Sequence, residues 1–215
     1  VFASTTQRLN VLTTELQENV MKTRMQPISF IWKKFPRFVR DLARSFDKQV
    51  EITMEGQETE LDKSVIEAIK GSLLHLVRNS IDHGIELPDD REAAGKPRQG
   101  TIFLKAYHKG GNICIEIVDD GRGLPRDKIL QKAIERGLVK EGEQLSDREI
   151  NNLIFEPGFS TAKQVTDISG RGVGMDVVRR NIEELRGTCD IQSEPGQGSV
   201  FSIKLPLTLA IIEGM

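Results

Sequence analysis

The chain has 215 residues, with 30 Lys and Arg against 32 Asp and Glu, and its formal net charge is −2 at pH 7. Apolar residues make up 38% and charged residues 29%, which excludes a disordered or fibrous protein and predicts one globular domain with an appendage. The near-neutral charge argues against a dedicated nucleic-acid binder. No apolar run approaches the ~18 residues of a membrane helix, and the N-terminus has no signal-peptide pattern. Because the chain lacks an initiator Met, we expect it to be part of something longer.

Cys114 and Cys189 are the only cysteines, and both lie in strand-like runs without a Cys-x-x-Cys motif. We therefore favour two buried free thiols over a disulfide. Three histidines and two distant cysteines cannot form a four-ligand zinc site with ordinary spacing, so a structural zinc domain is excluded.

The first part of the chain is predicted to be mostly helical. Residues 4–25 carry apolar side chains three or four apart, a narrow seam that suits packing against a partner helix, and Pro27 ends this helix. A second helical stretch, Ile28–Phe46, is kinked or restarted at Pro36, and Val50–Met54 alternates like a short strand. The seam residues are Leu9, Leu12, Leu16 and Val20.

The middle of the chain predicts a long helix followed by a hairpin. Asp62 can cap a helix that runs to about His83, with Gly84 in the C-terminal cap position. Thr101–Asp119 reads as two alternating strands joined by a tight glycine turn. The expected core side chains of this hairpin are Ile102, Leu104, Ala106, Ile113, Ile115 and Ile117.

The remaining elements predict an α+β fold. A helix is expected near residues 126–136, Ser146 and Glu149 can form the capping box of another, and a third spans about 174–187. A closing hairpin turns at residues 195–198. Because adjacent strands connect by tight turns, without regular βαβ alternation, we predict a mostly antiparallel sheet.

The long helix has two different faces. One carries small residues near its start and hydrogen-bonding residues near its end, namely Ala68, Gly71, Ser72, His75, Asn79 and Asp82. The opposite face is apolar, with Ile66, Leu73 and Val77. The polar face could leave space for a ligand or could simply be solvated. Gly71 inside a helix costs ~1 kcal/mol against Ala, and solvation gives no reason for it.

Three glycine-rich or aromatic segments also do not suit core packing. In the run from Asp119 to Gly123, the first carboxylate could accept from an exocyclic amine, although a plain Asp-Gly turn is the common alternative. Residues 170–174 could present backbone N–H groups to an anion at a helix start, but match neither the Rossmann nor the Walker pattern. Residues 155–161 could be a lid or a packed connector.

Together, and in this order, the segments resemble the N, G1, F and G2 boxes and a last glycine box of histidine kinases. The first segment has His at both ends, which resembles the CheA family of chemotaxis kinases within the GHKL superfamily. Residues 24–44 and 205–215 resemble the junctions of that catalytic domain with its neighbours, so the resemblance covers essentially the whole chain. The segments are HLVRNSIDHG at 75–84, DDGRG at 119–123, FEPGFST at 155–161, GRGVG at 170–174 and GQGSVFSI at 196–203.

This resemblance implies a two-layer α/β sandwich of the GHKL (Bergerat) type, with helices covering one face of a mostly antiparallel sheet. It implies the end of a dimerisation helix at residues 1–25, an ATP-binding catalytic domain at 26–206 and the start of a regulatory, receptor-coupling domain at 207–215.

The resemblance also implies roles for individual residues. Asp119 would bind the adenine amino group, Asn79 would coordinate Mg²⁺, and His75 would lie beside the metal and phosphates. His83 would reach the ribose or phosphates, with Asp82 a neighbour of open role. The residues implied to contact nucleotide through glycine boxes or lid are Gly121, Gly123, Ser160, Thr161, Gly170, Arg171, Gly172, Val173, Gly174 and Met175, and Lys163 could help.

The implied function is ATP-dependent transfer of a phosphoryl group to a histidine. His75 and His83 belong to the implied ATP site and His108 to a strand, so the acceptor is expected on a separate phosphotransfer domain, reached across a dimer. A response regulator, a chemoreceptor and a coupling protein are the further implied partners, with a cytoplasmic location beneath membrane receptor arrays. The alternatives are an ATPase clamp, which would need an acidic residue where the helix has His75, and a non-catalytic nucleotide-binding scaffold.

Overall fold

A five-stranded mixed sheet forms the centre of the computed structural model, which describes residues 7–8, 11–13, 15, 19, 23–157, 159 and 174–207. The strand order is β2-β4-β5-β7-β6, and β2 pairs parallel with β4 while the other pairs are antiparallel. The predicted α+β class and mostly antiparallel sheet are confirmed. The strands are β2 (Val50–Glu55), β4 (Gly100–Lys109), β5 (Asn112–Asp119), β6 (Thr188–Glu194) and β7 (Gly198–Pro206).

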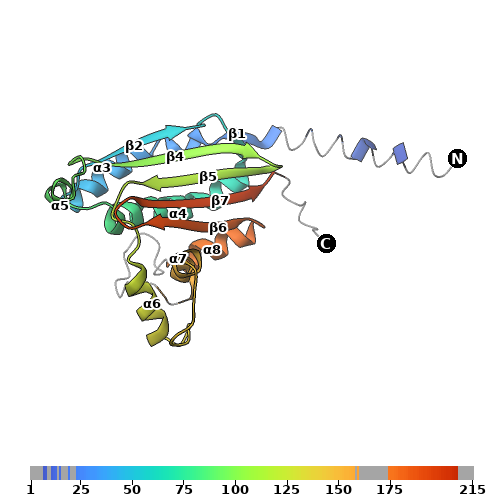
Figure 1. Cartoon of the computed structure of the whole chain (residues 1–215). Coiled ribbons are helices and arrows are strands. Elements are labelled where there is room, and N and C mark those ends of the chain that lie inside the picture. Colours follow the sequence, from blue (N-terminus) through green and yellow to red (C-terminus); the bar gives the residue numbers. More distant parts are fainter. Residues whose placement is uncertain are drawn as a thin grey trace.

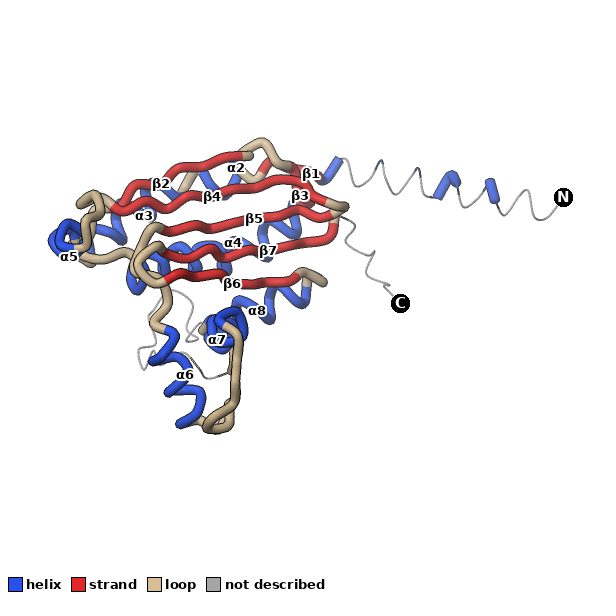
Figure 2. Tube along the Cα trace, in the orientation of Figure 1, coloured by secondary structure: helices blue, strands red, loops and turns tan. Residues whose placement is uncertain are grey.

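Three helices cover one face of the sheet: α3 (Phe35–Ser45), α4 (Lys63–Asn79) and α8 (Met175–Glu184) (Figure 1). The tube view shows that none of the described helices lies on the opposite face of the sheet (Figure 2). This arrangement is the two-layer sandwich that the resemblance implies.

The core lies between the sheet and these helices, as the alternating pattern predicts. All six core side chains expected from the hairpin are buried, and so are Ile66, Leu73 and Val77 on α4. Burying each such side chain contributes ~1.5–3 kcal/mol relative to leaving it in water. Both cysteines are buried free thiols, as expected.

The predicted helix signals are found in the structure. Asp62 caps α4 by accepting a hydrogen bond from the Ser64 amide at 2.7 Å. Both bonds of the capping box are present between Ser146 and Glu149 at the start of α7. The stretch around Pro36 is split into two helices, with the proline in the first turn of the second one. The smaller helical elements are α2 (Ser29–Trp32), α5 (Pro88–Ala93), α6 (Arg126–Glu135), α7 (Asp147–Asn152), the π-helical turn η1 (Ser80–Gly84) and the 3₁₀ turn η2 (Leu153–Phe155).

The N-terminal helix stops earlier than Pro27, contrary to the prediction. β1 (Met25–Pro27) pairs instead with β3 (Glu60–Asp62), and this long-range pairing overrides the local helical pattern. Of the seam residues, Leu12 is helical and 62% exposed, whereas Leu9, Leu16 and Val20 lie outside the described residues. Within the described part of the chain, no helix is long and apolar enough to cross a membrane.

A second, smaller apolar cluster holds α6 and α7 together beside the main sheet (Figure 1). Its buried members include Ile129 and Ala133 of α6 and Ile150 of α7. Because α6 follows the DDGRG segment directly, this cluster fixes where the chain leaves that segment.

Candidate functional site

The C-terminal end of α4 carries His75 and Asn79, half-buried on its polar side. The helix then continues as the wider π-helical turn η1. There the Ile85 amide donates to the carbonyl five residues earlier, that of Ser80, at 2.7 Å. π-helical turns of this kind are frequent at functional sites. The wider turn brings Gly84 against the end of β5.

Asn79 lies next to the start of α8, 96 residues further along the chain. Its side-chain amide donates to the Met175 sulfur at 2.9 Å. Met175 is the first residue of α8, and the helix is N-capped by Gly174 without a side-chain cap. The structure therefore brings the ends of the first and fourth sequence segments together.

Asp119 ends β5 and is buried among glycines. A β-carbon on Gly84 would lie 3.2 Å from the Asp119 carboxylate, and one on Gly121 would lie 2.3 Å from the Gly84 carbonyl oxygen. The Arg122 amide donates to that same Gly84 carbonyl at 2.9 Å. These glycines let the helix end and the DDGRG turn approach at backbone distance, as close approach requires.

The last glycine box supports this turn from the other side. The Gly196 amide donates to the Arg122 carbonyl at 2.8 Å, and the Leu124 amide donates to the buried Ser193 hydroxyl at 2.8 Å. Gly123 has φ +72°, and a β-carbon there would lie 2.4 Å from the Glu194 carbonyl oxygen. The β6–β7 hairpin therefore holds the DDGRG backbone in place.

The two central ionisable groups have shifted pKa values. Asp119 is only 3% exposed, and this burial raises the pKa of its carboxyl to about 6, against the opposing hydrogen bond from the Gly121 amide at 3.1 Å. Burial, helped by the nearby Arg78 and His83, lowers the pKa of the His75 imidazole below its ordinary value. His75 is therefore neutral at pH 7, and Asp119 is mostly ionised.

His83 lies at the rim of this region. Its side chain is 76% exposed, and its Nδ1 lies 3.7 Å from Asp82 Oδ1. The Asp82 carboxylate is therefore the polar group beside this exposed imidazole.

The small residues near the start of the α4 polar face do not make a ligand space. Ser72 is buried, and its hydroxyl oxygen lies 3.5 Å from the Asn181 side-chain nitrogen of α8. Ser72 therefore faces α8, whereas Ala68 and Gly71 are exposed, and we place only the end of the helix in the site. A β-carbon on Gly71 would meet nothing within 4 Å, and nothing in the structure explains this glycine.

Several implied nucleotide contacts lie outside the described residues: Ser160, Thr161, Lys163, Gly170, Arg171, Gly172 and Val173. The structure does describe the start of this segment, at residues 155–157. Phe155 is buried, and the Arg179 guanidinium of α8 lies over its ring at 4.2 Å from the centroid.

Sequence reasoning missed three cations that hold the site. Lys48 donates to the carbonyls of Ile81 and Asp82 in η1, at 2.7 and 2.6 Å. Arg91 and Lys96 bind the turn after Asp119. A Gly-Lys pair at 95–96 was visible in the sequence, but no spacing rule linked it to a turn some 25 residues away.

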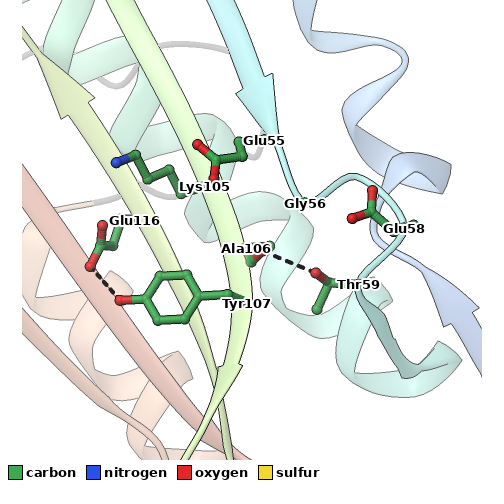
Figure 3. Close-up of a pocket in the computed structure, with 8 residues that line it drawn as sticks. All are labelled: Glu55, Gly56, Glu58, Thr59, Lys105, Ala106, Tyr107 and Glu116. Carbon is green, nitrogen blue, oxygen red and sulfur yellow. Dashed lines mark hydrogen bonds between the residues drawn. The ribbon is translucent and has the colours of Figure 1, made fainter.

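A hollow also lies on the face of the sheet opposite α3, α4 and α8 (Figure 3). It encloses about 510 Å³ between β2, β4 and β5 (Figure 3). Tyr107 donates to Glu116 at 2.8 Å across its floor, and Thr59 donates to the Ala106 carbonyl at 3.0 Å. It contains none of the glycine segments, so we do not assign the site to it.

Among the residues that the structure describes, no group of three His, Cys, Asp or Glu side chains is arranged to hold a metal ion. Asn79 nevertheless fits Mg²⁺. Its nitrogen is engaged by Met175, so the atom left to coordinate is its amide oxygen. Mg²⁺ uses few protein oxygens when nucleotide phosphates and water complete its octahedron.

A sequence profile of the histidine kinase-, DNA gyrase B- and HSP90-like ATPases matches residues 65–209. The chain belongs to this family. The matched range includes all but the first two residues of α4, the DDGRG turn and the closing hairpin, so the family match covers His75, Asn79 and Asp119.

Curated relatives add a closer similarity. The chemotaxis protein CheA of Klebsiella aerogenes is 58% identical over 201 residues, covering 94% of this chain and 31% of the relative. CheA of Bacillus subtilis is 51% identical over 210 residues, with 97% and 31% covered. The chain thus spans about a third of the length of these relatives. The nucleotide-free catalytic domain of histidine kinase ThkA has a TM-score of 0.54 at 18% identity, covering 86% of this chain and 95% of that one, which shows a shared fold.

Proposed function

We propose that this chain is the ATP-binding catalytic domain of a chemotaxis-type histidine kinase, and that it supplies the γ-phosphoryl group for a histidine on a separate phosphotransfer domain. The single observation that carries the proposal is the buried Asp119 carboxylate, enclosed by Gly84 and Gly121 beside the end of α4. The family match and the CheA relatives support the same reading.

In this proposal Asp119 recognises the adenine base. A carboxylate has about four lone-pair positions, and the donors around Asp119, of which the Gly121 amide lies at 3.1 Å, leave room for the exocyclic amine. Gly121 and Gly123 let the turn pack at backbone distance against Gly84 and Glu194, and this packing would hold the turn beside the base. A buried hydrogen bond to an ionised group contributes ~1.5–3 kcal/mol, enough to select adenine.

Asn79 would contribute the protein oxygen to Mg²⁺, which when bound neutralises and orients the phosphates. His75 would stand beside the phosphates as a neutral imidazole, able to donate a hydrogen bond without repelling the metal. His83 and the glycine-rich run from Gly170 to Met175 would complete the phosphate contacts. Such transfers depend mainly on positioning and electrostatics.

The acceptor histidine would lie outside this chain. The sequence has three histidines, and His108 lies on β4 opposite Ile113, exposed on the sheet. Residues 1–25 would end a dimerisation helix, 26–206 form the catalytic domain, and 207–215 begin a receptor-coupling domain. By similarity to CheA, the full-length protein would be a homodimer at receptor arrays in the cytoplasm and would pass phosphate to a response regulator.

The test mixes this chain with labelled Mg-ATP, with and without a phosphotransfer domain of the CheA type, and follows label onto histidine. Asn79→Ala and Asp119→Asn are compared with Asn112→Ala and Asp41→Asn, which remove the same groups from positions outside the proposed nucleotide contacts. Transfer that needs the added domain and is lost only in the first two variants supports the proposal. Nucleotide binding without transfer would indicate a scaffold, and steady phosphate release without an acceptor would indicate an ATPase clamp.

A further inference from the structure

A partly buried charged cluster, with Arg91 and Glu86 at its centre, lies behind the turn that follows Asp119. Arg91 of α5 is 0% exposed, and its guanidinium contacts Glu86 at 3.1 Å and Asp120 at 2.9 Å. Lys96 contacts the other Glu86 oxygen at 2.9 Å. The cluster thus pairs two cations with two carboxylates, none of which belongs to the nucleotide contacts proposed above.

Both cations also hold backbone oxygens of the turn. Lys96 Nζ donates to the carbonyls of Asp120 and Gly121 at 3.0 and 2.7 Å, and Arg91 donates to the Asp120 carbonyl at 3.2 Å. The Asp120 carboxylate is held in turn by the Thr101 amide at 2.9 Å. The turn is therefore fixed through both its side chain and its main chain.

One peptide plane links these cations to Asp119. The Asp120 carbonyl and the Gly121 N–H belong to the same trans peptide, so they point in opposite directions. The oxygen faces Arg91 and Lys96, and the N–H donates to Asp119 Oδ1 at 3.1 Å. Rotating this peptide would break the contacts with the cations and the contact with the Asp119 carboxylate together.

Stability alone does not explain the cluster. Buried ion pairs often contribute no more than apolar residues of similar volume would, because both charges lose their hydration. Apolar residues could not donate hydrogen bonds to the carbonyl oxygens of Asp120 and Gly121, and so could not fix their orientation.

We propose that Arg91 and Lys96 are positioning residues for adenine recognition: they fix the 120–121 peptide, which orients the Asp119 carboxylate toward the base. This inference rests on the proposed function, in which Asp119 reads the exocyclic amine. It assigns a specificity role to a segment that touches no nucleotide.

The test measures dissociation constants of ATP and inosine triphosphate, which has an oxygen in place of the exocyclic amine. Loss of one charge-assisted hydrogen bond should cost about tenfold or more in affinity. We expect Lys96→Met to weaken ATP by that factor and leave inosine triphosphate nearly unchanged, and Lys96→Arg to restore part of the preference. Arg98→Met is the matched control, because Arg98 bridges Asp89 and Glu92 on the same segment without touching the turn.

The two proposals fail in different ways. If Asp119→Asn keeps the wild-type preference for ATP, the adenine role of Asp119 is wrong. If that variant loses the preference but Lys96→Met keeps it, or weakens both nucleotides equally, the positioning role is overturned. Should Lys96→Met not fold, Arg91→Lys serves instead, since it keeps the charge but cannot span the Asp120 carboxylate and carbonyl. A loss of preference in Arg91→Lys supports the inference, and a wild-type ratio overturns it.

Discussion

Gly198 lies so close to Asp119 that a β-carbon at position 198 would stand 1.9 Å from the Asp119 carbonyl oxygen. Gly198 is the first residue of β7, and Asp119 is the last residue of β5. In the sheet Asp119 pairs with Ser199, the residue that follows Gly198. The close approach explains why the last glycine box belongs to the site. It supports the turn that follows Asp119 from behind and needs no direct nucleotide contact to do so.

Gly198→Ala should therefore destabilise the domain more than Gly196→Ala. Both glycines have positive φ, +105° and +79°, which costs an alanine about 1–2 kcal/mol. A β-carbon at 196 meets nothing within 4 Å, whereas at 198 it overlaps backbone and adds about 1–3 kcal/mol. Urea denaturation of both variants checks the difference. Equal losses would show that the turn yields without strain.

Asp119→Asn should stabilise the nucleotide-free domain at neutral pH. The folded-state pKa of about 6 lies above the ordinary value of 3.8, so ionised Asp119 opposes folding. This cost is complete above pH 6, shrinks as the pH falls, and vanishes below about 4. We expect a gain of about 2–3 kcal/mol at pH 7.5 that disappears at pH 4. Thermal unfolding across this pH range is the measurement, and a gain independent of pH would contradict it.

ATP binding should weaken as the pH falls below about 6. In the proposed function the ionised Asp119 carboxylate accepts the hydrogen bond from the adenine amine, and protonation of this carboxyl, whose pKa is raised to about 6, would compete with that role. The dissociation constant should rise by up to about tenfold per pH unit below the pKa. Calorimetric titration between pH 5 and 8 measures it, with inosine triphosphate as control for protonation of the phosphates. Parallel curves for the two nucleotides would exclude Asp119 as the cause.

Lys48→Met should loosen the end of the α4 segment. It removes the cation that holds the carbonyls of Ile81 and Asp82, leaving two main-chain acceptors without that partner. We expect a loss of about 1–3 kcal/mol of stability and faster amide exchange in η1. Hydrogen exchange followed by mass spectrometry compares this variant with Lys109→Met, whose side chain is exposed. Unchanged exchange in η1 would show that the π-helical turn holds without Lys48.

Much of the secondary structure was predictable because its signals lie within a few residues. The Asp62 cap, the capping box of α7 and the alternation of β4 and β5 each depend on neighbours in the chain. The predicted end of the N-terminal helix was wrong because β1 pairs with β3, and no pattern within a few residues of β1 indicates that partner.

For the site, the sequence alone determined which residues have the right chemistry: a carboxylate before glycines, an amide and an imidazole on one helix face, and glycines where backbone must approach backbone. Only the tertiary structure decided that Asn79 meets Met175, that Ser72 faces α8, and that Arg91 and Lys96 hold the turn after Asp119. The physical reason is range. Periodicity and capping act within one or two turns of chain, whereas the partner of a buried charge is chosen by the packing of elements that lie far apart in sequence.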